Sequence, residues 1–340
     1  MLESTYDMPN RSRMIDDPLS DVLRLAEVHS VVAGGFYASG TWGIHFPPPD
    51  KVKFFGVARG EGWIRFDDGA PPVRLGSGDV ILLAAARGFT LASAPDVPGV
   101  EARSLFAGRT DAFAAVGGAS SSDHEVMQVG GHFSPNTSYS PLLMDVLPPF
   151  IHVHGESTEA RALQWILQHL VQERAGLPGA ALATSQLGLL LFVQALRAHL
   201  ASGAVLKASW LRAATDARVA PVLRLMHGEP SRAWRLEELA RSAAMSRTGF
   251  ATHFKAVAGE APLAYLSRWR MHLAQRALRR GEATVGELAR SLGYASESAF
   301  SHAFKRLVGE SPKHYGARYR EATLPGDLRL PMREGEPQRE

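Results

Sequence analysis

Two stretches in the C-terminal third carry polar and basic side chains at matching positions. The first set is Thr248, Thr252 and Lys255, and the second, 50 residues further along, is Ser298, His302 and Lys305. Residues three or four positions apart share one face of a helix, so each set would form a polar stripe. Hydroxyl and imidazole groups can hydrogen-bond base edges, and ammonium groups can contact phosphates. The pattern therefore indicates two helices that each offer a face to nucleic acid.

The opposite face of each predicted helix is apolar. Its members stand at positions i, i+4 and i+7, and they are Phe250, Phe254 and Val257 in the first helix and Phe300, Phe304 and Leu307 in the second. We expect these side chains to hold each helix against a partner.

The similarity extends beyond these two helices. The segment 238–242 recurs at 287–291 as Glu-Leu-Ala-Arg-Ser, and Gly-Glu-x-Pro follows the polar helices at 259–262 and 309–312. Repetition in the same order and at nearly constant spacing is the signature of a duplicated structural unit.

Capping residues mark where the helices begin. Ser246 and Ser296 fit the N-caps of the two polar helices, and Thr284 with Glu287 fits a capping box. Each copy therefore predicts a helix, a short turn and a second helix. A helix-turn-helix places the second of these helices in the major groove of DNA.

Residues 210–316 resemble the AraC/XylS-type transcriptional regulators. The residues that carry the resemblance are Met245-Ser246-Arg247 with Phe250 and Phe254; Gly259–Leu266 with Trp269-Arg270-Met271, Ala274 and Leu278; and Gly293–Phe300 with Phe304-Lys305-Arg306. The resemblance implies two helix-turn-helix units joined by one long helix at about 262–280. It also implies that the two units read major-groove segments about 10 base pairs apart.

The resemblance and the helical faces together assign roles to individual residues. The expected base contacts are Thr248, Ala251 and Thr252 from the first unit and Ser298, Ser301 and His302 from the second. The expected phosphate contacts are Arg247, Lys255, Arg268, Arg270, Lys305 and Arg306. The first unit departs from the commoner family pattern by carrying the small residues Gly249 and Ala251, which predicts weaker base readout there.

Charge is distributed unevenly along the chain. Residues 221–320 hold 17 Lys and Arg against 8 Asp and Glu, a net charge of +9, so the rest of the chain carries −6 of the total of +3. A basic C-terminal third suggests a polyanionic partner for that part, although a solvated basic face would give the same count.

The N-terminal half has a different pattern. Short β-rich runs such as 51–66, 72–83 and 125–133 are separated by Gly and Pro turns, which predicts an all-β barrel or sandwich. Apolar residues then follow helical spacing over 157–174 and 179–201, where helices could pack on the barrel or pair two chains.

Residues 17–155 resemble the N-terminal cupin sensor of one AraC subgroup. The residues that carry this resemblance are Asp17–Leu23, Val57–Gly60 with Trp63, Gly78–Leu83, Gly130–Phe133 and Leu147-Pro148-Pro149. It implies a small barrel whose mouth can hold a small ligand or a metal.

Three positions depart from that subgroup. Phe55 and Phe89 stand where it often has histidines, and Gly130 stands where it often has cysteine. Phenyl rings offer no donor atoms to a metal, so we expect no metal centre here and no dioxygenase or isomerase chemistry. Phe54, Phe55, Trp63 and Phe89 could instead line an apolar effector pocket. An ordinary barrel core explains most of them equally simply and is the favoured interpretation.

A His-x-His pair at His152 and His154 imitates a metal motif. Alternation along a strand would place both imidazoles on one side. The pair falls past the last predicted barrel strand and lacks Gly-rich framing, so polar contacts or exposed histidines are favoured over a metal ligand.

Composition restricts the remaining possibilities. The chain has no cysteine, which excludes disulfides and thiol chemistry, and no apolar run long enough to span a membrane. Its first residues lack the apolar core of a signal peptide, which predicts a soluble cytoplasmic protein. The expected fold is a multidomain α+β chain: a flexible tail (1–16), a cupin-like barrel (17–155), a helical linker and dimerisation region (156–205), an all-α double helix-turn-helix domain (206–320, with units at about 236–257 and 285–307), and a disordered tail (321–340).

The sequence therefore predicts a DNA-binding transcription regulator, with activation favoured because most members of the family activate. Its expected partners are double-stranded promoter DNA, a small-molecule effector in the barrel, a second copy of the chain and, for an activator, RNA polymerase. We expect no cofactor, no catalytic residue and no membrane partner. Two alternatives stay open: a cupin metalloenzyme with an accessory DNA-binding module, and a constitutive architectural DNA binder with a vestigial barrel.

Overall fold

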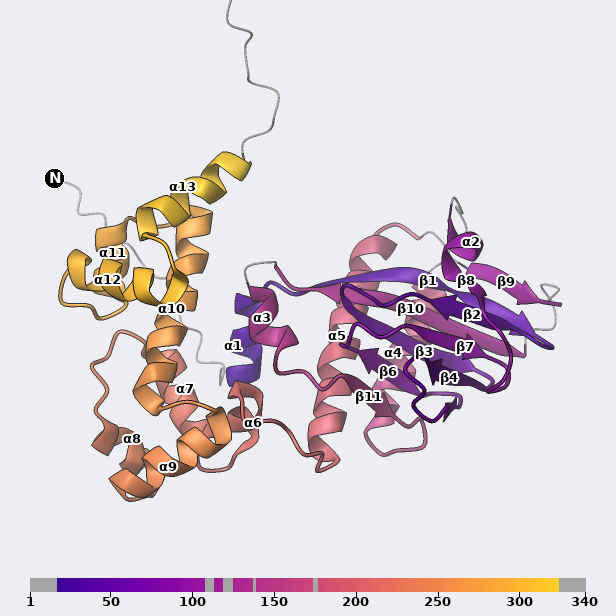
Figure 1. Ribbon diagram of the computed structural model, residues 1–340, viewed down its shortest axis with the longest axis horizontal. Coiled ribbons are helices and arrows are strands. Elements are labelled where there is room, and N and C mark those ends of the chain that lie inside the picture. The colour runs from indigo at the N-terminus through magenta and orange to yellow at the C-terminus, as the bar shows by residue number, and fades with distance from the viewer. Residues whose placement is uncertain (1–16, 108–112, 119–124, 137–138, 174–176, 324–340) are drawn as a thin grey trace, which may run out of the picture. The chain divides into compact units, whose positions relative to one another are not determined.

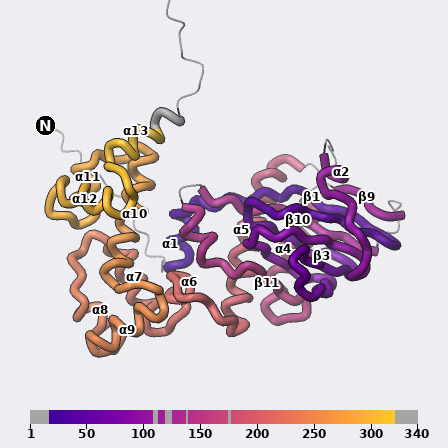
Figure 2. The backbone as a smooth tube through the Cα atoms, viewed as in Figure 1, coloured from indigo at the N-terminus to yellow at the C-terminus, as the bar shows by residue number. Residues whose placement is uncertain are grey.

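The computed structural model describes residues 17–107, 113–118, 125–136, 139–173 and 177–323, and Figures 1 and 2 trace them. Their contacts divide the chain into two units. One unit is Val22–Leu211, and the other combines Met1–Asp21 with Arg212–Glu340.

The first unit is built on two β-sheets. The six-stranded sheet has the order β11 (Phe150–Val153), β6 (Val80–Leu83), β3 (Val52–Arg59), β10 (Val126–Ser134), β1 (His29–Ser39) and β9 (Phe113–Gly117). The five-stranded sheet has the order β5 (Val73–Leu75), β4 (Gly62–Phe66), β7 (Phe89–Ala92), β2 (Gly43–Phe46) and β8 (Val100–Glu101). Most neighbouring strands are antiparallel, as expected for a chain rich in short strands and tight turns.

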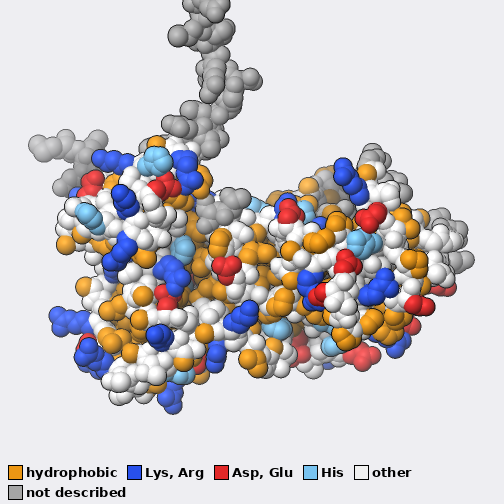
Figure 3. Space-filling model, viewed as in Figure 1, with side chains coloured by type: hydrophobic (Ala, Val, Ile, Leu, Met, Phe, Trp, Pro, Cys, Tyr) orange, Lys and Arg blue, Asp and Glu red, His pale blue; other side chains and the backbone are white. Residues whose placement is uncertain are grey.

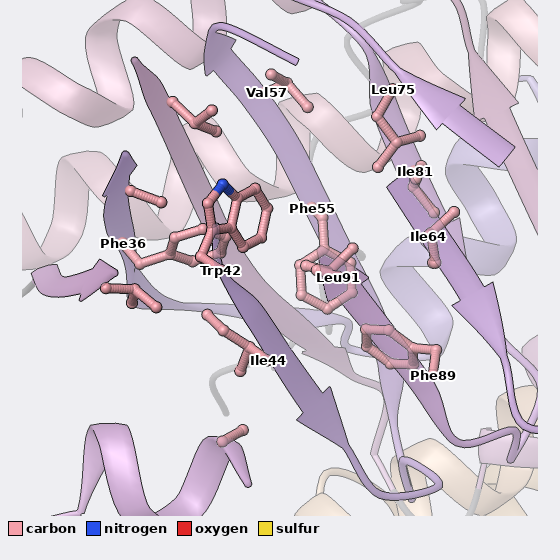
Figure 4. Packing of buried hydrophobic residues seen from close by; sticks show 14 of the residues in the cluster. Phe36, Trp42, Ile44, Phe55, Val57, Ile64, Leu75, Ile81, Phe89 and Leu91 are labelled. Atoms are coloured by element: carbon pink, nitrogen blue, oxygen red, sulfur yellow. The ribbon is translucent and has the colours of Figure 1, made fainter. Parts of the chain in front are cut away.

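An apolar core contains residues from both sheets (Figure 4). Alternate residues along the strands face this core, because successive side chains of a strand point to opposite faces. Phe55 of β3, Ile64 of β4 and Phe89 of β7 are all buried there. Phe55 and Phe89 meet edge to face, with ring centroids 5.1 Å apart.

Two helices pack on the six-stranded sheet, α4 (Ala160–Gln172) and α5 (Ala180–Ala201) (Figure 1). Close approach is possible because glycine occupies the contact points. A Cβ at Gly56 of β3 would lie 2.1 Å from a methyl of Leu167, and one at Gly188 of α5 would lie 2.4 Å from Ser30 Oγ. The Ser30 hydroxyl also donates a 2.5 Å hydrogen bond to the Ser185 carbonyl, which fastens α5 to β1.

Helix α5 is long and apolar enough to cross a membrane when judged by length and composition alone. In this structure one of its faces is occupied within the unit, where Leu191, Phe192 and Leu196 are buried. Phe192 packs against Phe133 of β10, with ring centroids 4.8 Å apart.

The second unit is helical and contains the duplicated motif. The first copy is α8 (Leu236–Ser242), a turn and α9 (Arg247–Ala258); the second is α11 (Val285–Ser291), a turn and α12 (Glu297–Val308). The helix predicted at about 262–280 is α10 (Pro262–Arg280), which lies between the copies in the chain. Before the first copy come α6 (Trp210–Thr215) and α7 (Ala220–Gly228), and α13 (Pro312–Thr323) follows the second.

The predicted caps are confirmed. Ser246 Oγ accepts from the Gly249 N–H at 3.1 Å, and Ser296 Oγ accepts from the Ala299 N–H at 3.1 Å. The Thr284–Glu287 capping box is also present, with Glu287 Oε2 accepting from the Thr284 N–H at 2.7 Å.

The apolar face predicted for the second recognition helix needs one correction. Phe300 and Phe304 are fully buried as expected, but Leu307 is 45% exposed. Val308, four residues after Phe304, packs against the core instead. The last apolar residue of α12 that packs on the core of the second copy is therefore Val308, at position i+8. In α9 the corresponding residue is Val257, at position i+7.

Three short helices and the chain ends complete the description. The short helices are α1 (Pro18–Leu25), α2 (Ala102–Phe106) and α3 (Ser140–Met144). The predicted flexible tail 1–16 lies outside the described residues. The predicted disordered tail 321–340 overlaps the end of α13, which continues to Thr323, and residues 324–340 lie outside the described residues. The observed order of a β-rich domain, helices and an all-α domain agrees with the predicted fold class.

Gly293, which lies before α12, provides a test of how closely the turn of the second copy packs against Ser231. Gly293 has φ +77°, and an added Cβ would lie 1.9 Å from the Ser231 carbonyl oxygen. Gly309 also has a positive φ, +94°, but its Cβ would meet nothing within 4 Å. Both alanine variants bear the left-handed penalty of about 1–2 kcal/mol. We expect Gly293→Ala to be less stable than Gly309→Ala by about 1–3 kcal/mol, as for overpacking, in chemical denaturation. Equal destabilisation would contradict the close approach at Ser231.

Candidate nucleic-acid interface

The structure places the predicted base-contacting residues on corresponding surfaces of α9 and α12. In α9, Thr248 and Thr252 are exposed and Ala251 is half-buried. In α12, Ser298 and His302 are exposed and Ser301 is half-buried. Each set thus forms one surface of its helix, but base contact by these residues stays a prediction.

The aromatic residues opposite these surfaces are arranged alike in the two copies. In the first, Phe254 contacts Phe250 and Tyr265 at ring-centroid distances of 5.6 and 5.8 Å. In the second, Phe304 contacts Phe300 and Tyr315 at 5.8 and 5.5 Å. The same edge-to-face packing of Tyr on the second Phe fixes each helix with its polar surface outward.

The first turns of the two helices differ in charge. Helix α9 begins with Arg247, whose guanidinium Nε lies 3.1 Å from Glu237 Oε1. Helix α12 begins with the exposed acid Glu297. An acid stabilises a helix N-terminus but repels phosphate, so the two units present different electrostatics at the same point.

Five of the six basic residues predicted to contact phosphates fall into two groups. Lys255, Lys305 and Arg306 are exposed, and none of them forms an ion pair with a carboxylate among the described residues. Arg247 and Arg268 are already paired, with Glu237 and Glu260 respectively. Figure 3 shows Lys and Arg side chains spread over the helical unit in this view. Of these five residues, Lys255, Lys305 and Arg306 are therefore not engaged by a carboxylate in the described part of the chain, and phosphate contact by them stays a prediction.

Arg270 has a structural role that the sequence did not reveal. Its Nε–H donates to the Pro230 carbonyl at 2.6 Å, and its Nη2–H donates to the Arg232 carbonyl at 2.8 Å. These bonds tie α10 to the loop before α8. The phosphate contact predicted for Arg270 stays a prediction, but two of its donors are already used.

Two histidines position the first copy, although no role was predicted for either of them from the sequence. His227 of α7 stacks on Trp269 of α10, with ring centroids 3.8 Å apart and planes 7° apart. Its Nε2 also lies 2.8 Å from the Tyr265 hydroxyl. Single histidines separated from their partners by about 40 residues give no local motif that would have identified them.

The second of these histidines holds the recognition helix itself. His253 Nε2 lies 3.0 Å from Asp216 Oδ2, which links α9 to the segment after α6. Burial opposes ionisation of Asp216, but hydrogen bonds from the Val219 N–H, His253 and the Arg218 N–H outweigh it and hold the pKa of this carboxyl below its usual value. Asp216 is therefore a stable anionic anchor for α9.

The four aromatic residues predicted as an effector pocket, Phe54, Phe55, Trp63 and Phe89, do not all face the same core. Phe55 and Phe89 meet in the barrel core, but Phe54 lies on the opposite face of β3, stacked on Phe133 at 5.0 Å. Trp63 lies outside that core cluster, although its neighbour Ile64 is inside it. Strand alternation sends the adjacent residues Phe54 and Phe55 to opposite sides. The burial of Phe55 and Phe89 in the core agrees with the favoured interpretation of an ordinary barrel core.

The placement of the His-x-His pair also needs correction. His152 belongs to β11, which pairs with β6 at the edge of the six-stranded sheet, and His154 directly follows the end of that strand, so His152 does not fall past the last strand. Glycine framing exists as well, since a Cβ at Gly155 would lie 2.3 Å from the Ser77 carbonyl oxygen.

Comparisons with known proteins agree with this architecture. Residues 17–201 match the Cupin family, and residues 239–318 match a family described as a helix-turn-helix domain. A Streptomyces lividans protein named "Putative AraC-like transcription regulator" is 40% identical over 300 residues, which is 88% of this chain and 97% of that protein. The HTH-type transcriptional regulator AlkR of Acinetobacter baylyi is 32% identical over 284 residues, covering 81% and 91% of the two chains.

Among solved structures, the DNA-binding domain of AdpA in complex with a target DNA is 33% identical. It covers 30% of this chain and 96% of that one, with a TM-score of 0.29. The family resemblance noted in the sequence is confirmed by the full-length relatives and by the two matched domains. The chain belongs to the AraC-like transcription regulators, with a cupin domain followed by a helix-turn-helix DNA-binding domain.

Proposed function

We propose that the chain binds promoter DNA sequence-specifically through α9 and α12 together. The observation that carries this proposal is the correspondence between the two helices. Each has a Ser N-cap, a buried Phe pair on one side and exposed hydroxyl or imidazole side chains on the other. A short helix held in this way is what a helix-turn-helix inserts into the major groove.

The two units differ in how much sequence information they can read. The α12 surface offers an imidazole at His302, while α9 offers the small side chains Thr248, Ala251 and Thr252. Small side chains reach fewer base-edge groups than an imidazole. The second unit should therefore contribute most of the discrimination between base pairs, and the first should act largely through phosphates.

The cupin domain is the proposed site of a small-molecule effector that favours one functional state of the regulator. Since the four aromatic residues do not converge, this proposal rests on the family and not on a pocket of those residues. Activation, with RNA polymerase as the partner, is proposed on the same basis. The expected location is the cytoplasm.

A homodimer is proposed through the helical region 156–205. The surface of this region exposes large apolar side chains: Trp165 on α4 is 50% exposed, and Leu182 and Leu190 on α5 are 68% and 40% exposed. Exposed apolar side chains grouped on packed helices are typical of protein interfaces. A second copy would bury the face of α5 that the sheet leaves open.

Selection of bound sequences from random DNA by the full chain tests the function. We expect one enriched motif with two parts about one helical turn apart. Enrichment of no motif would contradict sequence-specific binding.

His302 tests direct base readout. On the selected site, His302→Ala should weaken binding by about 1–3 kcal/mol, and the loss should vanish on DNA altered at one or two base pairs. His314→Ala is the matched control, because His314 is also exposed but lies on α13. Affinities on a panel of single-base variants measure both. A loss of equal size on every sequence would show that His302 does not read a base.

Substitutions at Lys305 and Arg270 distinguish a residue that contacts phosphate from one that stabilises the fold. Lys305→Ala should reduce the slope of log affinity against log salt by about 0.9, the value for one phosphate contact, and leave stability unchanged. Arg270→Ala should lower the unfolding free energy, because the Pro230 and Arg232 carbonyls lose their donors. Salt titrations and denaturation curves of both variants provide the measurement. An unaltered slope for Lys305→Ala would remove Lys305 from the interface.

A further inference from the structure

We propose that Asp79, His152 and His154 bind one divalent transition-metal ion, with Zn²⁺ as the representative ion, at the β6–β11 edge of the barrel domain. The proposed DNA-binding function does not use this site.

The backbone brings these three residues together from distant parts of the sequence. Strands β11 and β6 are antiparallel, with His152 opposite Ile81 and Val153 opposite Val80. Continuing that register by one residue places His154 opposite Asp79. His154 directly follows the end of β11, and its imidazole lies beside that of His152, with ring centroids 4.0 Å apart.

The donor atoms are close enough to share one ion. His152 Nε2 lies 2.8 Å from Asp79 Oδ2, and the two imidazole centroids are 4.0 Å apart. Each of the three residues offers one ligand atom, and these three atoms all lie within 4.8 Å of one another. Zn–N and Zn–O bonds of about 2.0–2.2 Å at tetrahedral angles separate neighbouring ligand atoms by roughly 3.3 Å. Binding thus requires a widening of the His152–Asp79 pair by about half an ångström and a small rotation of the exposed His154.

The Asp79 carboxylate is already oriented by the backbone. The Gly155 N–H donates to Oδ1 at 2.7 Å, and the Gly76 N–H donates to Oδ2 at 3.0 Å. Outer hydrogen bonds of this kind hold a metal ligand in place and raise its affinity. A carboxylate oxygen accepts two bonds, so an ion at Oδ2 would replace only the contact with His152.

Access and donor chemistry favour a transition metal. The side chains of His152 and Asp79 are each 9% exposed, whereas His154 is an exposed residue, so an ion could enter from the His154 side. Two imidazoles and one carboxylate suit zinc and its first-row neighbours better than Mg²⁺ or Ca²⁺, which prefer oxygen ligands. Three protein ligands would leave one position for water.

A second histidine with two acidic neighbours shows why geometry matters. His45 Nδ1 lies 2.8 Å from Glu101 Oε1, and His45 Nε2 lies 3.1 Å from Asp67 Oδ2. The two carboxylates approach opposite nitrogens of the ring, so the three groups cannot surround one ion. His152 and His154 instead lie on one side of Asp79.

Occupancy would stabilise the region between the sheet and α4. Gly155, which follows His154, accepts a 2.8 Å hydrogen bond from Gln164 Nε2 of α4 through its carbonyl. An ion held by Asp79, His152 and His154 would restrain this connection. Because a ligand that binds only the folded state stabilises it, zinc should raise the melting temperature of the barrel domain.

The test uses the full chain, produced without a histidine tag and freed of metal by chelator dialysis. ZnCl₂ is titrated by calorimetry, and CoCl₂ is titrated with the visible d–d absorption as the readout. We expect one ion per chain, an intense visible Co²⁺ absorption, and a zinc-dependent rise in melting temperature.

His154→Ala is the main variant, because its exposed ring can be removed without opening a cavity. It should lower zinc affinity by more than the 10–100-fold typical of losing an outer hydrogen-bond partner, and Asp79→Asn should give a loss of similar size. His169→Ala on α4 is the matched control and should leave zinc affinity unchanged. Absence of one-to-one binding by the unaltered chain, or equal affinity of the unaltered chain and His154→Ala, would overturn the proposal.

Discussion

The DNA-binding unit depends on one packing interaction that occurs twice: a tyrosine that follows a Gly-Glu-x-Pro turn packs against the second phenylalanine of a recognition helix. Tyr265 meets Phe254 and Tyr315 meets Phe304 at nearly the same distance. All four rings are almost entirely buried, so each helix has one orientation in which its apolar side is satisfied. The polar side is turned outward as a consequence. The chemistry of recognition is thereby set by residues that would never contact DNA.

Local patterns were sufficient to predict this unit from the sequence. Helix spacing, Ser caps and the Gly-Glu-x-Pro repeat involve residues close together in the chain, and each was found where expected. The one error in the apolar stripe, Leu307 in place of Val308, arises at a helix end. There the buried stripe can turn by one residue without loss of the core.

The barrel domain was harder to predict because its contacts are non-local. Adjacent phenylalanines at 54 and 55 looked like parts of one pocket, yet the strand sends them to opposite faces, one toward Phe133 and one toward Phe89. Asp79 and His152 are separated by 73 positions, and no spacing rule connects them before the pairing of β6 with β11 is known. The hydrogen bonds of Arg270 were not predicted for the same reason, since its partners are backbone carbonyls 38 and 40 positions away.

Helix α10 has a mechanical consequence for any duplex that both recognition helices contact. It is a single helix of 19 residues whose only proline stands at its first position, so it has no hinge along a length of about 28 Å. A stiff spacer of this kind cannot adjust to the phase of two half-sites. A duplex whose half-sites are out of phase with this spacing would have to bend or twist to fit, at a free-energy cost that depends on the stiffness of the intervening base steps. Base pairs that touch no side chain would in this way influence affinity through their elasticity.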